Sequence, residues 1–264
     1  MMKIAIFGDI HGHWCAFRDT VARIHEKTPL DLVLQCGDAQ PFRDEEDLEY
    51  MACPEKYREL GDFWFVHQGG ERFPVRTLLI GGNHDPWNVF DQNPLGCELA
   101  PNIEFMGRVG MRRIDGLKIV GVSGVYSEKY FGEPHMGWPY PRNLKKQATY
   151  YNSADIKKAM SFGQPDILLL HEWPHLMSKA RDDSWPSNWN NVGSEELSVL
   201  IESLSPRWCF CGHMHKYAEH KFRRTSIICL SDFHRDPENS YVILDTEKHT
   251  YSRPRSNSSM TLAS

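Results

Sequence analysis

Short runs of apolar residues recur along the chain, and most of them end in glycine followed by polar residues. The runs are rich in Ile, Val, Leu and Phe, which is typical of strands buried inside a sheet. Each is therefore predicted to be a buried strand. The five clearest runs are Lys3–Phe7, Leu32–Cys36, Thr77–Ile80, Ile167–Leu170 and Trp208–Cys211.

Helices are predicted between these strands, at Trp14–Lys27 and Glu45–Leu60, and again at Ser153–Met160. The first third of the chain thus alternates strand and helix, which indicates an α/β fold. The middle of the chain differs because three apolar segments follow one another closely. We expect these to be antiparallel strands of a second sheet, at Ile103–Gly107, Met111–Ile114 and Leu117–Ser123.

One long segment has neither a helical nor a strand period. Ser127–Tyr151 is aromatic, Pro-rich and Gly-rich, and a loop of about 25 residues within a compact domain is usually functional. Residues 1–250 are predicted to form a single domain that includes this segment. Residues 251–264 are Ser-rich and are predicted to be a flexible tail.

Composition narrows the class of protein. The net charge is -5 and 41% of the 264 residues are hydrophobic, so a general nucleic-acid coat protein is excluded and any contact with nucleic acid must be local. The apolar runs are too short to cross a bilayer, and the N-terminus does not have the pattern of a signal peptide. We therefore expect a cytoplasmic protein with no membrane partner.

The seven cysteines are odd in number and include no CxxC pair. They are expected to be buried, reduced thiols, as in most cytosolic proteins. Zinc binding by Cys209 and Cys211 is the less favoured alternative.

Polar side chains follow each of the five predicted strands, where α/β folds place their sites. A site for two metal ions needs carboxylate, amide and imidazole ligands of this kind. Taken singly, the block of polar residues after each strand is weak evidence for a metal site, because a Gly-Asp pair often makes a turn and a lone His is often structural. All five blocks together favour a metal site built from Asp9, His11, Asp38, Asn83, His84, His171, His213 and His215.

The blocks GDIHG, GD, GGNHD, the lone His of HEWP, and GHMH resemble those of the calcineurin-like metallophosphoesterases, over roughly residues 3–232. The resemblance implies an α/β fold with a two-sheet β-sandwich flanked by helices. It implies two divalent metal ions (Mn, Fe or Zn), with Asp38 bridging them, and a metal-activated hydroxide that attacks phosphorus. It implies one ion on Asp9, His11, Asp38 and His215, and the other on Asp38, Asn83, His171 and His213.

By the same resemblance, His84 lies near the leaving group and Asp85 orients it. Other motifs are similar to RNA lariat debranching enzymes, which cleave the 2′,5′-phosphodiester bonds of branched RNA. Asp9 is a departure, because the eukaryotic enzymes usually carry Cys there; the harder Asp predicts an ordinary Mn or Fe site. The motifs are Cys53–Tyr57, Gly61–Trp64, Gly81–His84, Ala100–Ile103, Gly121–Tyr126 and His171–Pro174.

The resemblance also implies that Ser127–Tyr151 covers the site and recognises a branch. Aromatic rings can stack on splayed bases and cationic groups can hold phosphates. The alternative is that these aromatics simply pack on the domain. The candidate substrate-binding residues are His13, Tyr126, Lys129, Tyr130, Trp138 and Arg142.

Two other functions stay open at this level. One is a phosphodiesterase or phosphatase acting on small nucleotides or phosphoproteins. The other is a binding module that kept the fold as a scaffold, which the filled ligand positions and His84 disfavour. No protein partner is indicated.

Overall fold

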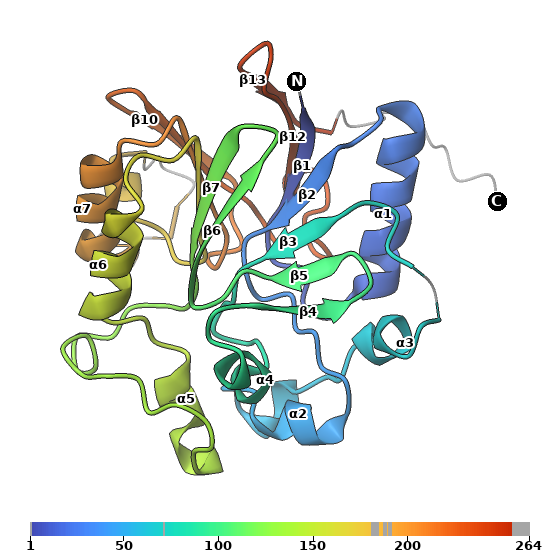
Figure 1. Cartoon of the computed structure of the whole chain (residues 1–264), viewed down its shortest axis with the longest axis vertical. Coiled ribbons are helices and arrows are strands. Elements are labelled where there is room, and N and C mark those ends of the chain that lie inside the picture. Colours follow the sequence, from blue (N-terminus) through green and yellow to red (C-terminus); the bar gives the residue numbers. More distant parts are fainter. Residues whose placement is uncertain (1, 71, 181–184, 187–188, 190–191, 255–264) are drawn as a thin grey trace.

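The computed structural model describes residues 2–70, 72–180, 185, 186, 189 and 192–254 of the chain. Two β-sheets pack face to face with helices outside them, as Figure 1 shows. The predicted α/β class with a two-sheet β-sandwich is confirmed. Within the described residues, no helix has both the length and the apolar character needed to cross a bilayer.

The first sheet combines strands from the N-terminal half with two strands from the C-terminal end. β1, β2, β3 and β5 run parallel, whereas β12 is antiparallel to β1 and β4 is antiparallel to β5. The seven strands lie in the order β13 (Thr250–Ser252), β12 (Tyr241–Asp245), β1 (Lys3–Phe7), β2 (Leu32–Gln35), β3 (Thr77–Leu79), β5 (Ile103–Phe105) and β4 (Cys97–Ala100).

The second sheet is also mixed. β7, β8, β9 and β11 run parallel, and the antiparallel strands β6 and β10 form its two edges. Its six strands lie in the order β10 (Ala218–Phe222), β11 (Thr225–Cys229), β9 (Trp208–Cys211), β8 (Ile167–Leu170), β7 (Leu117–Val122) and β6 (Val109–Ile114).

Central strands are apolar on both faces. In β1, Ile4 and Ile6 point into the core between the sheets, while Ala5 and Phe7 belong to the core beneath the outer helices. In β8, Leu169 likewise lies between the sheets. Because both faces are buried, these strands read as continuous apolar runs, which explains why the sequence pattern predicts them.

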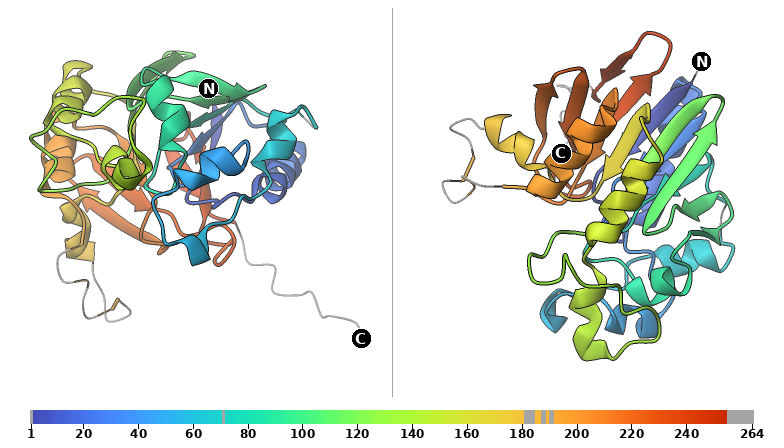
Figure 2. Two further views of the ribbon diagram at one scale, coloured as in Figure 1. Left: turned by 90° about the horizontal axis from the view of Figure 1, so that it is seen from below. Right: turned by 60° about the vertical axis from the view of Figure 1, so that its left-hand side comes forward.

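Helices cover the outer faces of the sandwich. α1 (Trp14–Lys27) packs on the first sheet, and α6 (Ser153–Ser161) and α7 (Glu195–Leu204) pack on the second (Figure 1; Figure 2). The shorter elements are α2 (Glu45–Glu49), η1 (Glu55–Tyr57), α3 (Phe63–His67), α4 (Trp87–Gln92), η2 (Arg142–Leu144), α5 (Lys145–Ala148) and η3 (His175–Ala180).

Three sequence predictions need correction. The helix predicted at Glu45–Leu60 ends at Glu49, and Pro54, which lacks an N–H and disfavours helical geometry in the residue before it, separates this helix from residues 55–60. β5 joins the first sheet beside β3, so of the three segments expected to pair antiparallel in the second sheet only β6 and β7 do so. The predicted tail begins too early, because Thr250–Ser252 forms β13; residues 255–264 lie outside the described residues.

A buried arginine ties the short helices to the second sheet. The Arg108 guanidinium binds both carboxylate oxygens of Asp91, in α4, at 2.6 and 2.8 Å. It also donates to the Ala148 carbonyl oxygen, in α5, at 2.8 Å, and lies over the Trp87 ring. This contact fixes the end of the 127–151 segment against α4.

We expect Arg108→Ala to lower the free energy of unfolding by about 3–5 kcal/mol, because the buried Asp91 carboxylate would lose its cationic partner. Arg112→Ala is the matched control. Its guanidinium binds the partly exposed Glu104, and such pairs contribute about 1 kcal/mol or less. Urea denaturation measures both. Equal losses in the two variants would show that burial of the Arg108 pair has no special importance.

Candidate metal centre

The predicted ligands meet where the carboxyl ends of the parallel strands of both sheets come together. Three of the five blocks follow strands of the first sheet, β1, β2 and β3, and two follow β8 and β9 of the second. The site therefore lies at an edge shared by the sheets. The loops carry Asp9 and His11, then Asp38, then Asn83 and His84, then His171, and finally His213 and His215.

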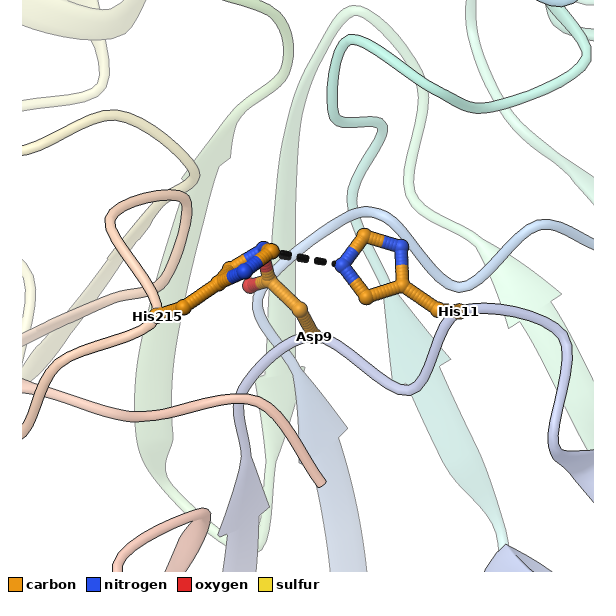
Figure 3. Close-up of side chains that lie close together, drawn as sticks. All are labelled: Asp9, His11 and His215. Atoms are coloured by element: carbon orange, nitrogen blue, oxygen red, sulfur yellow. Dashed lines mark hydrogen bonds and ion pairs between the residues drawn. The ribbon is translucent and has the colours of Figure 1, made fainter. Parts of the chain in front are cut away.

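One group of ligand atoms consists of Asp9, His11 and His215 (Figure 3). The Nε2 atoms of the two imidazoles are 2.9 Å apart, and the His215 Nε2 is 3.1 Å from Asp9 Oδ2. All three ligand atoms lie within 4.8 Å of one another. Three oxygen and nitrogen donors converging on one point could hold a divalent metal ion.

A second group consists of Asp9, Asp38 and His171. The His171 Nε2 lies 3.5 Å from Asp38 Oδ2 and 3.2 Å from Asn83 Oδ1. The His213 ring packs at 5.0 Å from the His171 ring, and its backbone N–H donates to Asp9 Oδ1. Asp9 thus offers oxygens to both groups, whereas the bridging role expected for Asp38 stays a prediction.

Electrostatics keep the two carboxylates charged. Burial opposes ionisation of Asp38, but the imidazoles of His171 and His84 outweigh it and hold the Asp38 pKa well below its usual range. For Asp9, burial is likewise outweighed, by the His215 hydrogen bond and the His171 charge, so its pKa is also lowered. Burial, followed by repulsion from His171, lowers the His213 pKa to about 4, which keeps it neutral and able to bind a metal. The donor set therefore fits divalent cations.

Four of the predicted ligands adopt left-handed backbone conformations. The φ angles are 43° at His11, 53° at Asp38, 70° at His213 and 50° at His215. Each such residue costs about 1–3 kcal/mol, and such strain clusters at functional sites. The turns let side chains two positions apart diverge, so His215 joins the first group while the His213 ring packs against His171 of the second.

Glycine is required beside both carboxylates. A Cβ on Gly212 would overlap Asp9 Oδ1, and a Cβ on Gly82 would overlap Asp38 Oδ1. These two positions keep open the space in which the carboxylates turn toward the imidazoles.

Asp85 does not contact the His84 ring as expected. Its carboxylate accepts hydrogen bonds from the backbone N–H groups of Gly82, Gln40 and Asp38 at 2.6, 2.6 and 2.9 Å. Burial, and then the Asp38 charge, raise the Asp85 pKa to about 7. Asp85 therefore holds the loops after β2 and β3 together, and the orienting role expected for it stays a prediction.

The His84 side chain is 30% exposed, with Nε2 4.0 Å from Asp38 Oδ2. Among the described residues, its Nδ1 has no hydrogen-bond partner. The His84 backbone N–H donates to Asp38 Oδ1 at 2.7 Å, which fixes the residue beside the carboxylate.

Two residues that orient the ligands escaped the sequence analysis. The Gln40 side-chain Nε2 lies 2.9 Å from His11 Nδ1. Asp232 Oδ2 faces the His215 Nδ1 at 3.7 Å and the His11 Nε2 at 3.8 Å. Asp232 follows β11 of the second sheet, so the rule of polar residues at strand ends could have found it.

A cavity of about 510 Å³ opens above His11, His84 and His215. One wall comes from Lys56, Tyr57 and neighbouring residues of the 51–59 segment, and another includes Asp232, His234 and Arg235; His13 also lines the cavity.

The other candidate substrate residues lie away from this lining. Tyr126 packs on the core between the second sheet and helices α6 and α7, Tyr130 stacks on Tyr150, and Lys129 lies over the Tyr130 ring. Trp138 packs against Tyr50, and Arg142 binds Glu49. For the described residues, the alternative that these aromatics pack on the domain fits the structure.

We expect Mn²⁺ to raise the melting temperature of the wild-type protein, because a ligand at 100 times its dissociation constant stabilises the native state by about 2.7 kcal/mol. Gly212→Ala should abolish most of this rise, since its Cβ displaces Asp9. Gly132→Ala is the control, because its Cβ would meet open space. Thermal unfolding with and without Mn²⁺ tests this; an undiminished rise in Gly212→Ala would contradict it.

Comparisons with known proteins agree with this geometry. The chain is 32% identical to "Lariat debranching enzyme A" of Xenopus laevis over 228 residues, which cover 81% of this chain and 43% of the relative. It is also 32% identical to "Lariat debranching enzyme" of Arabidopsis thaliana, again over 81% of this chain and 54% of the relative. The chain thus spans about half the length of the curated relatives it matches.

A crystal structure of TT1561 of Thermus thermophilus has the same fold, with a TM-score of 0.57 at 15% identity, covering 96% of this chain and 98% of the other. The family model for "Calcineurin-like phosphoesterase" matches residues 2–217, which include all five ligand blocks. The chain belongs to the calcineurin-like phosphoesterase family.

Proposed function

We propose that this protein is a metal-dependent phosphodiesterase that hydrolyses the 2′,5′-phosphodiester bonds of branched RNA with two divalent ions, Mn, Fe or Zn. One observation carries the proposal: two adjoining groups of ligand atoms share the buried Asp9, and His11 and His215 of the first group line an open cavity. The likeness to lariat debranching enzymes supports the choice of substrate.

The chain's own groups have defined tasks in this reaction. When bound, two divalent ions would supply Lewis acidity toward the phosphate and a water of lowered pKa. Asp9 and Asp38 hold the compensating negative charge. His84 lines the cavity beside Asp38 and is placed to donate a proton to the departing 2′-oxygen.

Two cationic side chains, Lys56 and Arg235, also line the cavity. Their charge favours the phosphates that flank the scissile bond. The cavity volume of about 510 Å³ falls in the range of small-ligand sites, which suits a nucleotide.

The seven cysteines support a cytoplasmic location as a further proposal. All of them are free thiols, and Cys36, Cys209, Cys211 and Cys229 are buried. Burial raises the pKa of each of these four thiols, so they stay protonated and inert.

We expect His84→Ala to keep Mn²⁺ binding while lowering turnover by about 10²–10⁴-fold, the contribution of one general acid. Asp38→Asn should lose both metal binding and turnover, because it removes a buried ligand charge. His220→Ala, on the edge strand β10, is the control for loss of an imidazole. Metal content and single-turnover rates are measured together; equal metal loss in both variants would reject this division of roles.

The substrate is tested with metal-reconstituted protein on a 2′,5′-branched RNA, its linear 3′,5′ counterpart and an aryl phosphodiester. We expect release of the branch at a rate well above cleavage of the linear RNA, and about 10²–10⁴-fold slower with His84→Ala. Cleavage of the aryl ester alone would reject branched RNA and direct attention to small nucleotides.

A further inference from the structure

A groove leaves the metal centre along helix α1. The cavity above the ligands adjoins a second cavity of about 680 Å³, and the two share His13 and His234 in their linings. The second cavity adjoins a third of about 300 Å³, and these share Thr20, Arg23 and Tyr241. Three cavities with common walls form one continuous path, which we call the α1 groove.

The dimensions of the α1 groove suit an extended chain. One wall is the face of α1 from His13 to Lys27, and the other is formed by residues 233–243. The helix has 14 residues, so this wall is about 20 Å long at 1.5 Å per residue. That length exceeds what one mononucleotide needs.

Aromatic rings line the α1 groove near the metal centre, and cationic groups follow them. The His13 and His234 rings stack at 4.4 Å with an angle of 16° between them, at the exit from the metal cavity. Phe233 and Tyr241 continue the wall, and the exposed cations Arg23 and Lys27 follow. Single-stranded nucleic acid is bound by this combination, with rings stacking on bases and cations tracking phosphates.

The acidic residues near the α1 groove do not cancel the positive charge of Arg23 and Lys27. Two acidic residues line the α1 groove beyond the metal cavity, Asp19 and Glu238. The Asp19 carboxylate accepts hydrogen bonds from the Arg18 guanidinium at 2.7 and 2.9 Å, so its charge is compensated. At the metal end, the exposed Arg235 side chain lies 3.8 Å from Asp232, so these two charges compensate each other.

We propose that the α1 groove binds one single-stranded RNA arm that leaves the metal centre, with the His13–His234 pair stacking on its first base and Arg23 and Lys27 holding its phosphates. This rests on the proposed function for the identity of the nucleic acid. The protein residues that would contact this RNA arm lie outside both the 51–59 wall and the 127–151 segment.

The first test is binding of a fluorescently labelled, linear single-stranded RNA, followed by anisotropy as salt concentration rises. Loss of two phosphate contacts in Arg23→Ala/Lys27→Ala should reduce the slope of log affinity against log salt by about 1.4, at about 0.7 per contact. Lys157→Ala/Lys158→Ala, on α6, removes the same charge elsewhere and should leave the slope unchanged. An equal slope in wild type and Arg23→Ala/Lys27→Ala overturns the proposal.

Stacking is tested separately with His234→Ala, which should weaken binding of the same RNA roughly fivefold to a hundredfold, the usual effect of removing one base-stacking ring. Its melting temperature and Mn²⁺ binding are measured alongside. Weaker RNA binding with unchanged metal binding supports the α1 groove, and unchanged RNA binding rejects the stacking pair.

The final test uses branched RNAs that share one core and differ in arm length. The kcat/KM of Arg23→Ala/Lys27→Ala should fall about tenfold or more on a long-armed substrate and stay within about twofold of wild type on a core with single-nucleotide arms. Equal falls on both substrates reject the α1 groove. If the wild-type protein cleaves neither branched RNA, the proposed debranching function is rejected. Binding of the linear RNA then still decides whether the α1 groove binds single-stranded RNA.

Discussion

Two buried, ionised carboxylates at the junction of the sheets govern the rest of this structure. Asp9 and Asp38 are almost wholly excluded from water, where an uncompensated charge is costly. Their charge is tolerated because imidazoles from both sheets converge on them. The parallel strands that end at this edge, the left-handed turns and the glycines without side chains all serve that convergence.

A second layer of polar groups holds the first in place. Asp85 joins three backbone N–H groups from two loops, and Gln40 and Asp232 face the ring nitrogens of the ligands. Such contacts fix the tautomer and direction of a metal-binding imidazole. The precision of the centre thus depends on residues that would not touch a metal ion.

The sequence predicts those parts that depend on local pattern. The buried strands are apolar throughout, and the candidate ligands directly follow them in the sequence. The positions of apolar and polar residues along the chain therefore predict both. The strand that pairs with β5 cannot be predicted from such a local pattern. It depends on which sheet the chain joins after α4, and the tertiary fold decides this. Gln40 contacts a ligand that is distant along the chain, and no local spacing reveals that contact. Asp232 could have been predicted from its place after β11, but its approach to His11 and His215 depends on the fold. The role of Ser127–Tyr151 stays open at the level of sequence because aromatic rings that stack on bases and rings that fill a core have the same composition.

The left-handed turns at His11, Asp38, His213 and His215 also have a cellular consequence. The backbone strain is present in the folded chain with or without metal ions. The stabilisation of the native state by bound metal, which offsets that strain, is lost when metal is absent. A protein short of metal is therefore closer to the threshold at which proteases and chaperones remove unfolded chains, and a change of about 1–2 kcal/mol alters abundance several-fold. Metal supply would then set the amount of this protein in a cell as well as its competence.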